Sequence, residues 1–171
     1  MPNSNPTVSN RIYRRHFIVA NIVGFGALMT AECLSKPPAH RARILFVCQA
    51  GTAKSAIARE IFKQRTKERD VAVDVISRGL VVEDHISPEL RQKLLNDGIN
   101  TTAEPALPLL AADWAAADIL VNFNPLPASV VHKDVRDWSD VPSVNDDYAN
   151  ARSLMTKRID ALLSEIAGKT K

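Results

Sequence analysis

The apolar residues after position 40 fall into short uninterrupted runs that alternate with segments of helical period. The first run, Ile44-Leu45-Phe46-Val47, favours β structure and is typical of a strand buried on both faces. From Ser55 onward the apolar positions recur four residues apart, while basic residues fall on the other faces. The apolar positions of this predicted helix are Ile57, Ala58, Ile61 and Phe62, and the basic ones are Arg59, Lys63 and Arg65.

The same reading predicts three more strands and three more helices. The strands are expected at residues 71–76, 118–123 and 135–138, and the helices between Ser87 and Gly98, at 109–116 and at 145–167. Ser87 fits the N-cap of its helix, Pro88 the first turn and Gly98 the C-terminal end. The buried stripe of that helix is expected at Leu90, Leu94 and Leu95. The apolar face of the last helix consists of Ala151, Leu154, Met155, Ile159, Leu162, Leu163 and Ile166.

Strands that alternate with helices at these lengths predict an α/β fold, a four-stranded parallel sheet with helices on both faces. A chain of 171 residues suits one such domain with a core of its own. In a sheet of this kind the functional site lies at the carboxyl ends of the strands, which is where Cys48 falls.

Residues 1–40 are interpreted as a targeting segment and linker, so the domain is expected at 41–171. Arg14-Arg15 precedes a mostly apolar run, Phe17 to Ala31, which resembles a twin-arginine export signal, and Lys36-Pro37-Pro38 follows as a linker. A general secretory signal or an uncleaved anchor is the alternative, although the run is shorter than the ~20 residues of a spanning helix. We expect export to the bacterial periplasm, with a membrane-anchored or a cytoplasmic protein as alternatives.

The net charge of +3 originates in this N-terminal segment. Four basic side chains and one acidic side chain lie in residues 1–40, which leaves 18 of each sign in the rest of the chain. No basic stripe interleaved with aromatic residues is visible, so no nucleic-acid partner is expected. His85 is interpreted as an exposed loop histidine. Because no second His or Cys stands at metal-ligand spacing from it, we predict no metal and no other cofactor.

The loop between the first strand and the first helix, Cys48-Gln49-Ala50-Gly51-Thr52-Ala53-Lys54, has the composition of an anion site. A strand that turns through small residues into a helix aims several backbone N–H groups and the helix dipole at one point. We expect residues 49–54 to bind phosphate there. The same geometry, with Lys54 nearby, favours the thiolate form of Cys48, which is the nucleophilic form. A core cysteine in an ordinary turn is the alternative.

Cys48-x5-Lys54-Ser55 after this strand resembles the phosphate loop, Cys-x5-Arg-Ser, of the low-molecular-weight protein tyrosine phosphatases and their arsenate reductase relatives. Ser77-Arg78-Gly79-Leu80 is similar to the family's Ser-Ala-Gly-Thr turn, and Asp118 to Phe123 is similar to its third strand. The resemblance implies that Cys48 is the nucleophile and that Ser55 supplies a hydroxyl that supports the thiolate. The partner would be a phosphorylated protein or a small phosphate or other oxyanion.

Two positions depart from the family's pattern. Lys54 stands where the family has arginine. The ammonium of lysine is a point charge, whereas the planar guanidinium of arginine binds two phosphate oxygens at once, so we expect a loss of order ~10²–10³ in rate. The family's acid, an aspartate in Trp-Asp-Leu-Pro-Asp-Pro, protonates the leaving phenol. Here the loop reads Trp138-Ser139-Asp140-Val141-Pro142-Ser143-Val144, and the acid position falls on Ser143. Asp140 is the first candidate to replace the acid, and Asp146 is the second.

These residues leave three functions open. The leading hypothesis is a weakened protein tyrosine phosphatase that hydrolyses phosphotyrosine or aryl phosphates through Cys48. The second is a non-catalytic pseudophosphatase that binds phosphate or another oxyanion. The third is an arsenate reductase, which would need an external thiol because Cys33 and Cys48 are the only cysteines and none follows the loop. A Cys33–Cys48 disulfide would silence the site.

Overall fold

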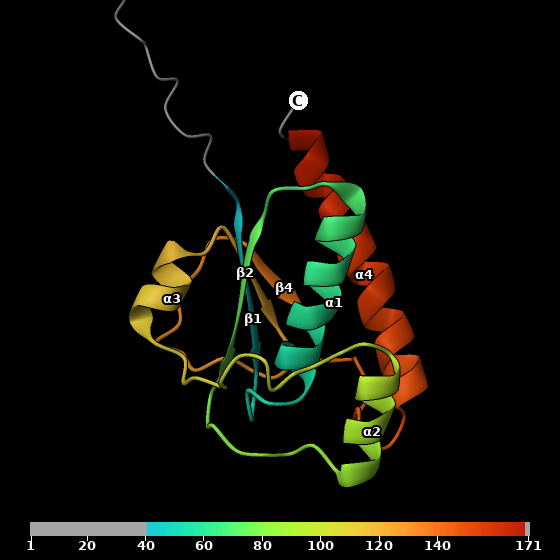
Figure 1. Cartoon of the computed structure of the whole chain (residues 1–171). Coiled ribbons are helices and arrows are strands. Elements are labelled where there is room, and N and C mark those ends of the chain that lie inside the picture. Colours follow the sequence, from blue (N-terminus) through green and yellow to red (C-terminus); the bar gives the residue numbers. More distant parts are fainter. Residues whose placement is uncertain (1–40, 170–171) are drawn as a thin grey trace, which may run out of the picture. The chain divides into compact units, whose positions relative to one another are not determined.

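The strand that carries the loop, β1 (Arg43–Cys48), lies inside the sheet and is buried at five of its six residues. The computed structural model describes residues 41–169, and its four strands pair in the order β2-β1-β3-β4 with every pairing parallel (Figure 1). The other strands are β2 (Asp74–Gly79), β3 (Ile119–Asn122) and β4 (Val135–Asp137). The carboxyl ends of β1, β2 and β3 therefore reach one edge together, as the sequence predicts.

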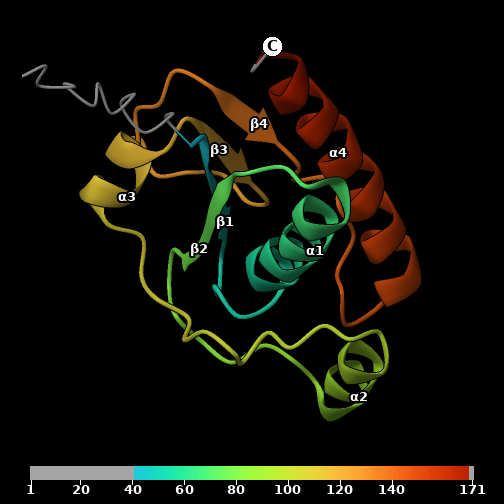
Figure 2. The same cartoon turned by 45° about the horizontal axis from the view of Figure 1, so that its top comes forward.

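Helices cover both faces of this sheet, which confirms the predicted fold class (Figures 1 and 2). The long helices α1 (Lys54–Arg69) and α4 (Tyr148–Lys169) lie side by side on one face, and the short α3 (Ala111–Ala116) lies on the other. The fourth helix, α2 (Pro88–Asn96), buries Leu90 and Leu94 in the same cluster as α1 and α4. Alternate residues of β1 enter two cores, Phe46 toward α1 and α4 and Leu45 toward α3.

An aromatic cluster joins β1 to the loop after β4. The ring of Phe46 lies 5.8 Å from the ring of Phe62, 6.3 Å from that of Phe123 and 5.8 Å from that of Trp138, measured between centroids. Phe123 and Trp138 meet edge to face at 5.8 Å. Because Trp138 is only 7% exposed, this packing fixes the start of the loop on which the family's acid would stand.

Several elements begin or end elsewhere than the periodicity predicts. β2 is expected at 71–76 but spans Asp74–Gly79, because its register is set by six consecutive pairs with β1 that run from Arg43↔Asp74 to Cys48↔Gly79. The α2 stripe is correct at two positions, but Leu95 is 54% exposed. The last helix begins at Tyr148 instead of 145 and continues to Lys169.

The predicted export signal or anchor and its linker lie outside the described residues. None of the helices in residues 41–169 is long and apolar enough to cross a membrane.

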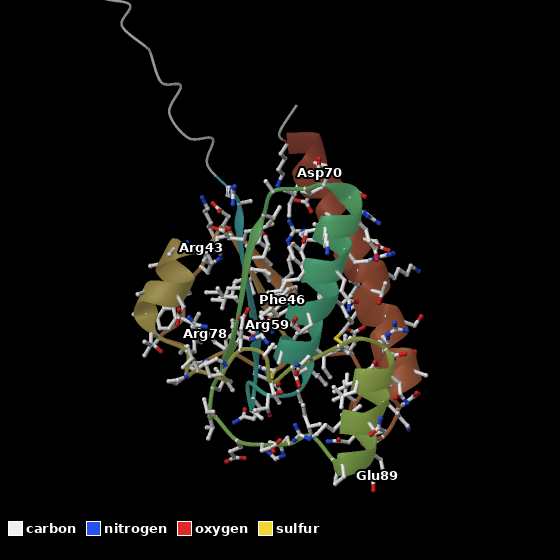
Figure 3. All side chains as sticks on the ribbon, in the orientation of Figure 1. Arg43, Phe46, Arg59, Asp70, Arg78 and Glu89 are labelled. Atoms are coloured by element: carbon white, nitrogen blue, oxygen red, sulfur yellow. The ribbon has the colours of Figure 1, made fainter. Side chains whose placement is uncertain are left out.

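Arg59 contradicts the expectation that the basic residues of α1 face away from the core. Its side chain is 2% exposed and donates to Glu60 Oε1 at 2.7 Å, to Ser77 Oγ at 2.9 Å and to the Thr101 carbonyl at 3.4 Å (Figure 3). Glu104 lies 3.5 Å from the same guanidinium. A charge can be buried here because acceptors surround it, and it ties α1 to β2 and to the segment before α3.

We expect Arg59→Ala to lower the free energy of unfolding by about 3 kcal/mol, because it leaves the half-buried Glu60 with only the longer contact to Lys63 at 3.4 Å and opens a cavity. Arg69→Ala is the matched control on the same helix, since Arg69 pairs with Asp160 at the surface and should cost at most about 1 kcal/mol. Urea denaturation of both variants measures the difference. Equal losses would show that Arg59 contributes no more than a surface arginine.

Candidate active site

The loop from Cys48 to Lys54 is held from outside by the segment that follows β2. Leu80 N–H donates to the Cys48 carbonyl at 3.0 Å, Val81 N–H to the Gln49 carbonyl at 2.8 Å and Glu83 N–H to the Ala50 carbonyl at 3.2 Å. Three successive loop carbonyls are thus engaged on one side. Since a peptide's N–H points opposite to its C=O, this bonding directs the amides of Ala50 and Gly51 away from the segment after β2, and the Gly51 amide meets the sulfur.

The sulfur of Cys48 lies inside this loop, where two polar groups converge on it. Gly51 N–H donates to Sγ at 3.2 Å, and Ser55 Oγ lies 3.0 Å from Sγ. Cys48 is 3% exposed and Ser55 is fully buried. With the sulfur ionised, both groups act as donors to it, an arrangement that stabilises a thiolate. Cys48 is thus buried in the same apolar cluster as α1 and α4, and its sulfur also meets two polar groups at the base of the loop.

Gly51 is the position at which the loop requires glycine. Its φ of +74° lies in the left-handed region, and a Cβ built on it would come within 2.9 Å of the Gly79 nitrogen. The reverse also holds, because a Cβ on Gly79 would lie 2.9 Å from the Gly51 nitrogen. The two glycines let the loop rest directly on the last residue of β2.

The six residues predicted to bind phosphate all lie in this loop, but their polar groups differ in what they contact. Gln49 N–H already donates to Asn124 Oδ1 at 2.9 Å, so this amide is engaged by a side chain that follows β3. The Thr52 hydroxyl donates to the Glu83 carbonyl at 2.6 Å and accepts from His85 N–H at 3.3 Å. Both contacts brace the loop. Asn124 was missed as a site residue because nothing in the sequence links position 124 to position 49.

Lys54 extends from the first turn of α1 toward the loop after β4, where its ammonium donates to the Val141 carbonyl. Burial lowers the pKa of Lys54 below the ordinary 10.5, while the charges of Cys48 and Asp140 act in the opposite direction. The ammonium thus lies between Cys48 and the carboxylate of Asp140, one on each side of the site. An anion above Cys48 would meet a point charge here and not a guanidinium fork.

The carboxylate of Asp140 is bound by an arginine of α4, a contact that the sequence pattern does not predict. Arg158 of α4 donates to both of its carboxylate oxygens, at 2.7 and 2.5 Å, and its guanidinium carbon lies 5.7 Å from the ring centroid of Trp138. These hydrogen bonds lower the pKa of Asp140 below 3.8, with a smaller contribution from Lys54. Asp140 is therefore ionised at neutral pH, the wrong form for a general acid.

The other two positions considered for the acid are in the turn before α4. Ser143 is exposed, and its carbonyl accepts from Asp147 N–H at 2.9 Å. Asp146 is exposed in the same turn, and Asp147 Oδ1 accepts from Asn150 N–H at 3.2 Å, as a helix cap does. Within residues 41–169, no carboxyl group on this loop combines a raised pKa with a contact to Cys48 or Lys54.

A cavity of about 240 Å³ lies beside the loop, but Cys48 does not line it. Its walls come from Gly51 and Thr52, the first turns of α1 and the segments 84–86 and 101–106. This space is therefore not where an anion would meet the sulfur. His85 is exposed and pairs with Glu83, and the described part of the chain holds no group of three His, Cys, Asp or Glu residues that could ligate a metal.

A cysteine at the end of a central parallel strand, within a loop that leads into a helix, is the arrangement of the cysteine-dependent phosphate loops. The low molecular weight phosphotyrosine protein phosphatase family matches this chain over residues 43–146, and the chain belongs to that family. No curated protein matches the chain.

Solved structures share the fold at low sequence identity. YfkJ from Bacillus subtilis superposes with a TM-score of 0.66 at 16% identity, covering 78% of this chain and 99% of its own. An arsenate reductase in a phosphate-binding state gives 0.58 at 18% identity, with 73% and 98% covered. The YwlE arginine phosphatase from Geobacillus stearothermophilus gives 0.55 at 18% identity, with 75% and 94% covered. At these identities the likeness shows the fold alone.

Gly79→Ala tests whether the loop depends on the backbone contact with β2. We expect it to lower the free energy of unfolding by about 1–3 kcal/mol and to weaken phosphate binding, because the added Cβ forces the loop away from Gly79. Gly168→Ala is the control, since a Cβ there meets nothing within 4 Å and helix propensity favours alanine. Thermal unfolding with and without inorganic phosphate measures both effects. An unchanged phosphate response in Gly79→Ala would contradict the role given to this contact.

Proposed function

We propose that this protein is a low-molecular-weight phosphatase with Cys48 as the nucleophile, acting weakly on phosphotyrosine or aryl phosphates. The observation that carries the proposal is the convergence of Gly51 N–H and Ser55 Oγ on Cys48 Sγ. An ordinary structural cysteine has no use for two donors at its sulfur, whereas a thiolate nucleophile depends on them.

The chemistry follows in two displacements at phosphorus. Cys48 Sγ attacks the phosphorus, a sulfur–phosphorus bond forms, and the bond from phosphorus to the phenolic oxygen breaks with its electron pair on that oxygen. Water then attacks the phosphocysteine, the sulfur–phosphorus bond breaks, and inorganic phosphate and the thiolate are released. Inward-facing loop amides and the ammonium of Lys54 stabilise the charge on the equatorial oxygens.

The proposal of weak activity rests on the leaving group and on Lys54. Asp140 is paired with Arg158 and ionised, and Ser143 has no proton to give near neutral pH, so a phenol must leave as the phenolate. Loss of general acid catalysis costs typically ~10²–10⁴ in rate. Aryl phosphates whose phenols are already acidic suffer least from that loss, and tyrosine phosphate suffers more.

A non-catalytic oxyanion binder is the second candidate, and the same Asp140–Arg158 pair favours it. A site that keeps the anion loop but ties up its remaining carboxylate binds phosphate without releasing a product. Arsenate reduction through an external thiol is the third candidate. Cys48 is the only free cysteine in the described part of the chain, so no internal resolving thiol supports that route.

Turnover of para-nitrophenyl phosphate by the full chain separates these functions. We expect slow hydrolysis that Cys48→Ser abolishes, since serine is not ionised at neutral pH. Ser164→Ala is the control, because the exposed Ser164 hydroxyl donates to the Asp160 carbonyl within α4. Stabilisation by phosphate without turnover would favour the binder. Thiol-dependent reduction of arsenate, lost in Cys48→Ser, would favour the third function. No turnover and no phosphate response would refute the phosphatase proposal.

A series of aryl phosphates tests the missing acid directly. We expect kcat/KM of the native protein to fall steeply as the pKa of the leaving phenol rises, because no group protonates the departing oxygen. Ser143→Asp should flatten this dependence, raising hydrolysis of the poorest leaving groups by up to ~10² while changing para-nitrophenyl phosphate little. Lys54→Arg should raise kcat/KM for the whole series by a similar factor, since it restores the fork. A flat dependence in the native protein would mean that another acid is at work.

A further inference from the structure

Four ionisable groups run from the loop to α4. The sulfur of Cys48 is followed by the ammonium of Lys54, the carboxylate of Asp140 and the guanidinium of Arg158. Lys54 bonds to the carbonyl of Val141, the residue next to Asp140, and Arg158 holds both oxygens of Asp140. Arg158 is thus connected to Lys54 indirectly, through the adjacent loop residues Asp140 and Val141.

The guanidinium of Arg158 is itself fixed. It lies over the ring of Trp138, which is packed in the aromatic cluster, and its side chain is only 26% exposed. A guanidinium that donates to both oxygens of a carboxylate is held in one orientation, and the Trp138 ring beneath it restricts the plane of the guanidinium. Asp140 by contrast is 64% exposed and has no comparable packing of its own. Its position therefore depends on Arg158.

We propose that Arg158 is a positioning residue of this site, which fixes Asp140 and the Val141 carbonyl against Lys54 and so keeps the ammonium in place for an anion above Cys48. The inference rests on the proposed function only in assigning that anion to the substrate. It also explains why Asp140 does not serve as the acid, because the carboxylate is committed to the ion pair.

The requirement for such support follows from the position of Lys54. Burial lowers the pKa of this side chain, and the two charged groups that oppose the effect are Cys48, at the end of β1, and Asp140, on the loop after β4. The ammonium holds an anion only while it is protonated. If Asp140 moves into solvent, the pKa of Lys54 falls further. On titration from neutral toward alkaline pH, Lys54 then loses its proton earlier, and anion binding is lost at a lower pH than in the native protein.

Arg158→Met in the full chain tests the proposal, because methionine keeps apolar contact with Trp138 and loses the fork. We expect the alkaline limb of para-nitrophenyl phosphate turnover and of inorganic phosphate affinity to move to lower pH, with about tenfold weaker phosphate binding on that limb. Asp140→Asn should give the same shift, and the double variant should be no worse than either single one. Arg158→Lys should fall between, since it retains the charge without the fork.

Arg152→Met is the matched control, because Arg152 is on the same helix and pairs with Asp97 at 3.4 Å, away from this loop. It should leave the pH limb unchanged. An unshifted limb in folded Arg158→Met or Arg158→Lys, or the same shift in Arg152→Met, would overturn the inference. A titration of the Lys54 ε-carbon by NMR, assigned with Lys54→Arg, needs neither turnover nor phosphate. A lowered Lys54 pKa in Arg158→Met would support the positioning role even if the native protein proved inactive.

Discussion

The site depends on a contact between two pieces of backbone that have no side chains between them. Gly51 and Gly79 approach so closely that a methyl group on either would fall within 3 Å of the other's nitrogen. Around this contact, the segment after β2 donates N–H groups to three loop carbonyls, and the sulfur lies on the inner side of the loop. The parallel pairing of β1 with β2 brings the two glycines together, because Cys48 and Gly79 are partners in its register. The sheet therefore shapes the anion loop directly.

The charged residues around this loop differ from those of the family's pattern. A lysine takes the place of the guanidinium expected in the loop, and the one carboxylate that faces it is bound to an arginine from α4. The result is a site in which two polar groups meet the Cys48 sulfur while the carboxylate of Asp140 is held in an ion pair. Under the proposed function, such a site would discriminate among phosphate esters chiefly by how well the alcohol departs unaided. The fold also occurs in an arsenate reductase and an arginine phosphatase, so fold alone does not choose among these chemistries.

Arg59 and Lys54, both on α1, are buried to different degrees and with different consequences. Arg59 is enclosed and satisfied by acceptors from α1, β2 and the segment 101–104, so it acts as a structural tie behind the loop. Lys54 is only half-buried and lies between Cys48 and the carboxylate of Asp140. A change near Arg59 is therefore expected to appear in stability, and a change near Lys54 in the pH dependence of anion binding.

The local pattern was sufficient for the strand, loop and helix around Cys48 and for naming Cys48 as the candidate nucleophile. The apolar run at 44–47, the small-residue loop and the helical period after Ser55 predict strand, loop and helix, because each is set by neighbours within a few residues. The same pattern predicted β2 three residues too early, Arg59 on an exposed face and Leu95 in the core. All three predictions were wrong, because register and burial depend on partners far along the chain. Arg158 and Asn124 could not be found at all: each reaches the site only through contacts, with Asp140 and with Gln49, that folding creates. What the sequence determined was the order of strand, small-residue loop and helix and the side chains that the loop offers, because these depend on near neighbours. What the tertiary structure decided was which charges stand beside the loop, because those come from distant parts of the chain.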